Sequence, residues 1–111
     1  MRTLLRSTAF EEFYNSLQMK VQNKVKYALN IIAELKVVNT KLVKKLVETD
    51  FYELRISVGN EYRVILFTID QENFIEAEQI LLLLLNGFMK KSTKDYKKEL
   101  VMAQQILNSL Q

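Results

Sequence analysis

The sequence predicts an α+β protein, in which helices pack on a small antiparallel sheet. Two segments, Tyr52–Val58 and Glu61–Ile69, alternate in polarity and are rich in β-branched and aromatic residues. Three other segments repeat apolar residues every three or four positions, which is the period of an amphipathic helix. With 111 residues and 49% hydrophobic side chains, the chain can bury one core, so we expect a single domain over residues 1–111.

The first third of the chain predicts a short strand, Arg2–Arg6, followed by a pair of helices. A capping-box pattern begins at Thr8, and an apolar stripe follows it. A second apolar stripe runs from Val21 to Leu35. Because one helix over this whole stretch would be long for a small domain, the polar residues indicate a break near Ser16–Met19 and an antiparallel helix pair.

The two alternating segments predict a hairpin that turns near Gly59. If the loop has an odd number of residues, and we expect three, the apolar side chains of the two strands lie beside each other on one face. An even number would mix charges into the apolar face. We prefer the odd loop, which places Arg55, Ser57 and Arg63 together on the opposite face.

The remaining elements follow from local patterns. Residues 41–47 are expected to form a short turn, and residues 70–78, with four carboxylates, an exposed connection. The apolar run Ile80–Phe88 predicts a central strand. Ser92 is spaced to cap a last helix, whose buried stripe would be Tyr96, Leu100, Ala103, Leu107 and Leu110. We expect the helices to cover one face of the sheet and the arginines to occupy the other.

The composition excludes several kinds of site. The chain has no cysteine and no histidine, which excludes disulfides, thiolate metal sites and the usual general base near neutral pH. We therefore expect neither a metal nor a cofactor. We expect no signal peptide, because the first residues are charged too soon, and no membrane span, because the run Ile80–Leu85 is far shorter than the roughly 20 residues that cross a bilayer. We expect a cytoplasmic protein without a membrane partner.

Four cations suggest an anion-binding face. Arg55 and Arg63 are the only cations between residues 45 and 90, in an interval with eight carboxylates. A cation within an apolar strand is costly unless it is paired or faces a groove. Lys90 and Lys91 follow the third strand directly. The plainer interpretation is that Arg55 pairs with Glu53 or Glu61 on a solvated sheet face and that the lysines form a solvated helix start.

Three sequence motifs follow one another along the chain: Tyr52-Glu53-Leu54-Arg55, Tyr62-Arg63-Val64 and Leu84-Leu85-Asn86-Gly87-Phe88-Met89-Lys90-Lys91. In this order and at this spacing they resemble the HigB-like branch of the RelE/ParE toxin superfamily, including its phage-derived relatives. The resemblance covers nearly the whole chain and implies a RelE-like fold. The connection at residues 70–79 is longer than the family pattern, and no proline follows the paired lysines.

The resemblance implies the toxin of a type II toxin–antitoxin pair. Such a toxin would be a metal-independent endoribonuclease, or mRNA interferase, that cuts messenger RNA in the ribosomal A site. Its partners would be the ribosome, messenger RNA and a cognate antitoxin with a helix-turn-helix domain. Two alternatives share the fold: a ParE-type toxin that inhibits DNA gyrase without cutting RNA, and a non-enzymatic member that only binds its antitoxin.

The chemistry suggests a role for each candidate residue. Arg55 and Arg63 would hold the phosphate and stabilise its transition-state charge, because a guanidinium binds two phosphate oxygens. An ordinary lysine is a poor base, but neighbouring cations improve it, so Lys90 or Lys91 is expected to accept the 2′-hydroxyl proton. We expect Arg63 to be exposed and dispensable for folding. Two further candidates for contact with RNA are Asn86 and Lys94, although Asn86 also suits a strand-end hydrogen bond.

Overall fold

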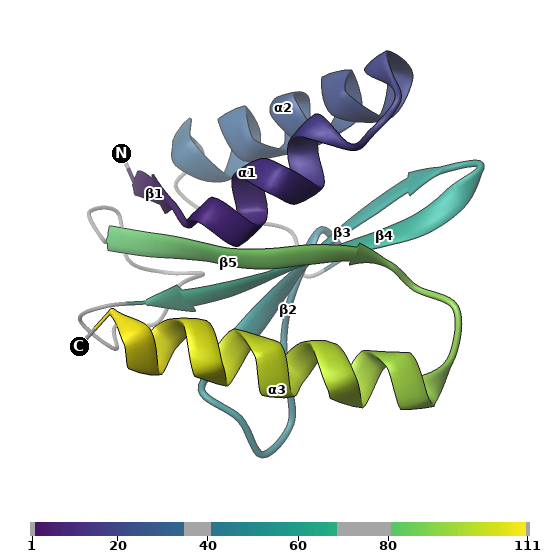
Figure 1. Ribbon diagram of the computed structural model, residues 1–111. Coiled ribbons are helices and arrows are strands. Elements are labelled where there is room, and N and C mark those ends of the chain that lie inside the picture. The colour runs from purple at the N-terminus through teal and green to yellow at the C-terminus, as the bar shows by residue number, and fades with distance from the viewer. Residues whose placement is uncertain (1, 35–40, 69–80, 111) are drawn as a thin grey trace.

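The computed structural model describes residues 2–34, 41–68 and 81–110, which form a five-stranded sheet with helices on both faces (Figure 1). The α+β class is confirmed. The strands are β1 (Thr3–Arg6), β2 (Val43–Lys45), β3 (Phe51–Val58), β4 (Asn60–Thr68) and β5 (Leu81–Met89). The helices are α1 (Thr8–Asn15), α2 (Met19–Glu34) and α3 (Thr93–Ser109).

The sheet has the strand order β1-β5-β4-β3-β2, so β5, which was predicted to be central, is an interior strand beside the middle strand β4. Its strands are antiparallel except for the parallel pair of β1 and β5. The predicted hairpin register is confirmed, because Arg55 lies directly opposite Arg63. Pairing continues to Val58 and Asn60, so Gly59 alone links the strands in place of the three loop residues that we expected. Its φ of 73° lies in the left-handed region, where glycine is favoured.

The first helix begins one residue earlier than the capping box suggested. Ser7, rather than Thr8, is the N-cap, and its hydroxyl accepts a hydrogen bond from the backbone N–H of Phe10 at 3.0 Å. The same hydroxyl donates to the carbonyl of Leu85, which attaches the start of α1 to β5. The predicted break is confirmed at Ser16, and α2 runs back alongside α1 (Figure 1).

Residues 41–47 were expected to be a turn, but they contain strand β2. The strand is not visible as an alternating pattern, because only Val43 of its three residues is buried. It forms by pairing with β3, where Val43 lies opposite Leu54. The end of the second helix at Leu35 and the acidic connection at residues 70–78 lie outside the described residues.

Two cores lie on opposite faces of the sheet, so the expectation that all helices cover one face is wrong. The core under α1 and α2 includes Phe10 and Leu54, which are fully buried. The core under α3 includes Ile65 and Leu85, also fully buried. Successive side chains of a strand point to opposite faces, and the central strands carry apolar residues on both. The face that α1 and α2 leave open is covered by α3 (Figure 1). Leu110, expected in the buried stripe of α3, is 57% exposed at its C-cap.

At Gly87, the Phe13 ring of α1 packs directly against the backbone of β5. A Cβ at this position would lie 2.3 Å from an atom of the Phe13 ring, so any side chain would displace that ring. The glycine of the third motif therefore serves packing. None of the helices within the described residues is long and apolar enough to cross a membrane.

Candidate anion-binding site

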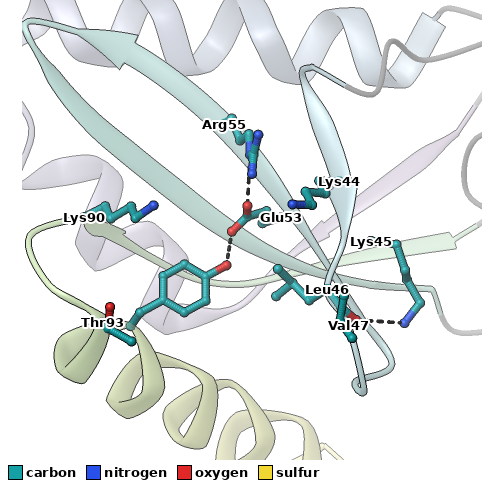
Figure 2. A pocket seen from close by; sticks show the side chains of 9 residues that line it. Lys44, Lys45, Leu46, Val47, Glu53, Arg55, Lys90 and Thr93 are labelled. Carbon is teal, nitrogen blue, oxygen red and sulfur yellow. Dashed lines mark hydrogen bonds and ion pairs between the residues drawn. The ribbon is translucent and has the colours of Figure 1, made fainter.

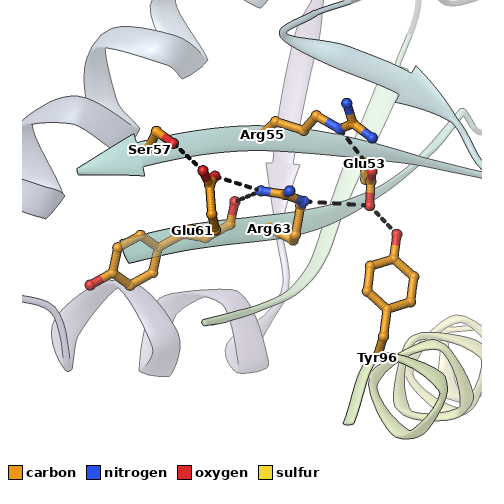
Figure 3. A network of polar contacts seen from close by, with 7 residues as sticks. Glu53, Arg55, Ser57, Glu61, Arg63 and Tyr96 are labelled. Atoms are coloured by element: carbon orange, nitrogen blue, oxygen red, sulfur yellow. Dashed lines mark hydrogen bonds and ion pairs between the residues drawn. The ribbon is translucent and has the colours of Figure 1, made fainter. Parts of the chain in front are cut away.

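A polar cluster occupies the face of β3 and β4 that points toward α3. Alternation along β3 places Glu53, Arg55 and Ser57 on this face, and the register adds Arg63 and Glu61 from β4. Like charges directly opposite in a sheet repel each other, yet Arg55 and Arg63 are such a pair. Figure 3 shows why the arrangement is stable: each arginine has a carboxylate beside it.

Glu53 is the centre of this cluster and is only 3% exposed. One carboxylate oxygen accepts a hydrogen bond from Nε of Arg55 at 2.9 Å. The other oxygen accepts a hydrogen bond from the hydroxyl of Tyr96, on the first turns of α3, and lies 3.9 Å from Nε of Arg63. A buried carboxylate needs such partners, because an unpaired buried charge is strongly unfavourable.

Arg63 is buried, which corrects the expectation of an exposed arginine. It is 7% exposed, because α3 covers part of the arginine face. Its Nη1 donates to Glu61 Oε2 at 3.3 Å and to the carbonyl of Tyr62 at 3.0 Å. Its Nε has no hydrogen-bond partner among the described residues. Arg63 therefore lies beneath the surface as the counter-charge of Glu53 and Glu61.

A pocket of about 330 Å³ opens beside this cluster (Figure 2). Its charged lining consists of four cations and one carboxylate, so it favours an anion. The side chains of Lys44 and Lys90 point toward Glu53 from opposite sides (Figure 2). The side chain of Lys45 points away from Glu53, because its Nζ donates a hydrogen bond to the carbonyl oxygen of Thr49 (Figure 2). The lining residues are Lys44, Lys45, Leu46, Val47, Glu53, Arg55, Lys90, Thr93 and Tyr96.

The structure brings together some of the predicted site residues and separates others. Arg55 and Lys90 line the pocket, whereas Arg63 lies below it. Lys91 is exposed but is not part of the pocket lining. Lys94 lines a separate shallow groove on the outer side of α3.

Asn86 is 1% exposed and serves the packing of α3. Its side-chain amide donates to the carbonyl oxygen of Glu99 at 3.1 Å and to Oε2 of the same residue at 2.8 Å. These bonds make Asn86 a structural hydrogen-bonding residue, as in the alternative to RNA contact, although it lies within β5 and not at the end of the strand.

Two ionisable groups of the cluster have shifted pKa values. Burial, reinforced by the hydrogen bond to Glu53, raises the pKa of Tyr96 well above its ordinary value of 10.0. The tyrosine therefore stays protonated and remains a hydrogen-bond donor at neutral pH. The hydrogen bond from Ser57, followed by that from Arg63, lowers the pKa of Glu61 below its ordinary value of 4.5.

Three residues of the site were not identified from the sequence. Glu53 was considered only as a possible partner of Arg55, and that pairing is confirmed. Tyr96 was assigned to the buried stripe of the last helix, and its position gave no sign of a polar contact. Lys44 and Lys45 were missed because β2 was missed.

The geometry suits binding of a phosphate group. Arg55 and the two inward-pointing lysines can surround an anion, and guanidinium and ammonium groups are the usual phosphate ligands of proteins. Within the described residues, no group of three or more carboxylates is placed to hold a metal ion.

Comparison with known proteins gives one finding. Residues 12–108 match the family described as phage derived protein Gp49-like, so the match includes all the residues of the pocket. No curated protein matched the chain.

Proposed function

Because the chain belongs to the Gp49-like family of phage-derived proteins, within the RelE/HigB-like toxin superfamily, we propose that it is a ribosome-dependent endoribonuclease. In this proposal it is the toxin of a type II toxin–antitoxin pair and cuts messenger RNA in the ribosomal A site. Its partner would be an antitoxin with a helix-turn-helix domain.

One observation supports this proposal most directly: the pocket gathers cations from three distant parts of the chain. Lys44 and Lys45 come from β2, Arg55 from β3 and Lys90 from the residue after β5. The net charge of the chain is only +3, yet four of its cations line this one pocket. Such a concentration attracts the phosphates of RNA, and the attraction falls with salt.

Cleavage by the 2′-hydroxyl develops extra negative charge on the phosphate that is attacked. In our proposal, the guanidinium of Arg55 binds this phosphate and stabilises the developing charge. Arg63 supports it from below by keeping Glu53 neutralised. Lys90 is our candidate for the proton acceptor, because it lines the pocket and Lys91 does not. The ribosome would align the RNA for in-line attack, which is an orientation effect.

Mapping messenger RNA ends after induction of the protein without a partner tests the proposal. We expect growth arrest and new 5′ ends within translated regions. Intact transcripts together with trapped gyrase–DNA complexes would replace the proposal with the ParE-type function. Growth without arrest would indicate a member that only binds its antitoxin.

A matched pair of lysine variants locates the chemistry. Lys90 lies in the pocket and Lys94 lies in the groove on the outer side of α3, and both are exposed. Lys90→Ala should abolish cleavage, whereas Lys94→Ala should only weaken ribosome binding, because it is one of several screened charges. The reverse pattern would show that the active site lies outside this pocket.

A further inference from the structure

We infer that Tyr96 is a positioning residue of this site: its hydroxyl holds Glu53, and Glu53 in turn fixes the guanidinium of Arg55 at the pocket. Tyr96 acts through other residues in this inference and is not itself a catalytic residue. The inference rests on the proposed function only in that the anion bound by Arg55 is taken to be an RNA phosphate.

The first step is the way in which Arg55 is held. Glu53 binds Arg55 through Nε alone, at 2.9 Å, and no other side-chain hydrogen bond of Arg55 occurs within the described residues. The two terminal nitrogens of the guanidinium therefore remain available to a ligand. A guanidinium held by Nε presents its remaining N–H groups as a fixed fork, which matches two phosphate oxygens.

The second step is the way in which Glu53 is held. Each of its two carboxylate oxygens accepts a hydrogen bond, one from Nε of Arg55 and the other from the hydroxyl of Tyr96 (Figure 3). Arg63 is 3.9 Å from the second oxygen and lacks hydrogen-bond geometry to it. Tyr96 is thus the only hydrogen-bond donor to that oxygen among the described residues, and without it the carboxylate could rotate toward Arg63.

The third step is the way in which Tyr96 is held. Its ring meets the ring of Phe88 edge to face, with the centroids 5.5 Å apart. Phe88 is 8% exposed in the core under α3. Because the ring is packed and its pKa is raised, the hydroxyl is a fixed and protonated donor. The chain of contacts therefore extends from the core under α3 to the guanidinium at the pocket.

Tyr96→Phe removes one oxygen atom and keeps the ring, so it isolates the hydrogen bond. Tyr27→Phe is the matched control, because Tyr27 is 62% exposed on α2 and far from the arginine face in the fold. We expect Tyr96→Phe to lower kcat for cleavage of ribosome-bound messenger RNA by roughly 10- to 100-fold, the cost of misplacing a catalytic group. The KM should change by less than about threefold, since the lysines of the pocket still attract the RNA.

The nitrogen NMR signal of Arg55 Nε–H tests positioning without any need for activity. We expect Tyr96→Phe to shift this signal and to speed its exchange with solvent, and Tyr27→Phe to leave it unchanged. Glu53→Gln should produce the same changes, which keeps the inference testable if Tyr96→Phe does not fold.

The outcomes separate this inference from the proposed function. Lost cleavage with an unchanged Arg55 signal would overturn the inference, because Tyr96 would then act directly. Unchanged cleavage and an unchanged signal would overturn it as well. If the wild-type protein cuts no RNA but Tyr96→Phe shifts the Arg55 signal and Tyr27→Phe does not, the inference is supported and the proposed function fails.

Discussion

Arg63→Ala should destabilise the fold, although the strand position of Arg63 suggested that it would be harmless. The side chain of Arg63 is 8% exposed and that of Glu53 is 3% exposed, so the ion pair between them is buried. Removing one partner of a buried pair costs about 3–5 kcal/mol when nothing else compensates the remaining charge. Here Glu53 keeps Arg55 and Tyr96, while Glu61 is exposed enough to be hydrated.

This partial compensation reduces the expected cost to about 2–3 kcal/mol, the upper part of the range for a hydrogen bond to a charged group. For a domain of this size, the melting temperature should fall by about 10 °C. Urea unfolding at pH 7 should show a midpoint lower by roughly 1–2 M. Arg6→Ala is the control, since the Arg6–Glu11 pair spans 3.7 Å between half-exposed side chains and should contribute about 0.5 kcal/mol or less.

A double variant shows whether the cost arises from the uncompensated carboxylate. Adding Glu53→Gln to Arg63→Ala should recover part of the lost stability, because no charge then remains buried. If Arg63→Ala unfolds at the wild-type urea concentration, Arg63 is not the buried counter-charge of Glu53. The electrostatic account of the site would then be wrong.

Three further predictions follow from single contacts. Gly87→Ala should lower stability by about 1–3 kcal/mol, measured by urea unfolding, because its methyl group would meet the Phe13 ring; equal stability would show that the ring moves freely. The free energy of unfolding should fall as the pH rises above 10.0, the ordinary pKa of tyrosine, because the unfolded chain loses the Tyr96 proton while the folded protein keeps it. Tyr96→Phe should show a smaller fall, and parallel curves for the two proteins would contradict this prediction. Ser57→Ala should raise the pKa of Glu61 toward its ordinary value of 4.5, as followed by NMR titration, and an unchanged titration would refute the role of that hydrogen bond.

The hairpin was predictable because its information is local. Strand alternation and the need to separate charges from the apolar face fixed the register, and hence the pairing of Arg55 with Arg63. The break between α1 and α2 was predictable for a similar reason, from polar residues near Ser16. The cap at Ser92, whose hydroxyl accepts a hydrogen bond from Asp95 N–H, also follows from short-range spacing.

The rest of the site depends on tertiary contacts that no local pattern encodes. Arg63 is buried because α3 covers the second face of the sheet, whereas the sequence analysis placed all the helices on the face opposite the arginines. Strand β2 is short, with two exposed lysines, and exists by pairing with β3. The role of Tyr96 requires a contact across 43 residues of sequence. The positive charge of the pocket therefore depends on tertiary structure. Of its four cations, the motifs identified only Arg55 and Lys90.

The most direct test of the account is cleavage of one defined messenger RNA by purified protein, with and without programmed ribosomes. We expect the wild-type protein to cut within the A-site codon only when ribosomes are present. Arg55→Ala should lower the rate by roughly 100- to 1000-fold, the cost of removing one group that stabilises transition-state charge, while its urea midpoint stays above that of Arg63→Ala. Messenger RNA that stays intact with the wild-type protein, or equal cleavage by Arg55→Ala, would contradict the claim that this basic pocket is the active site.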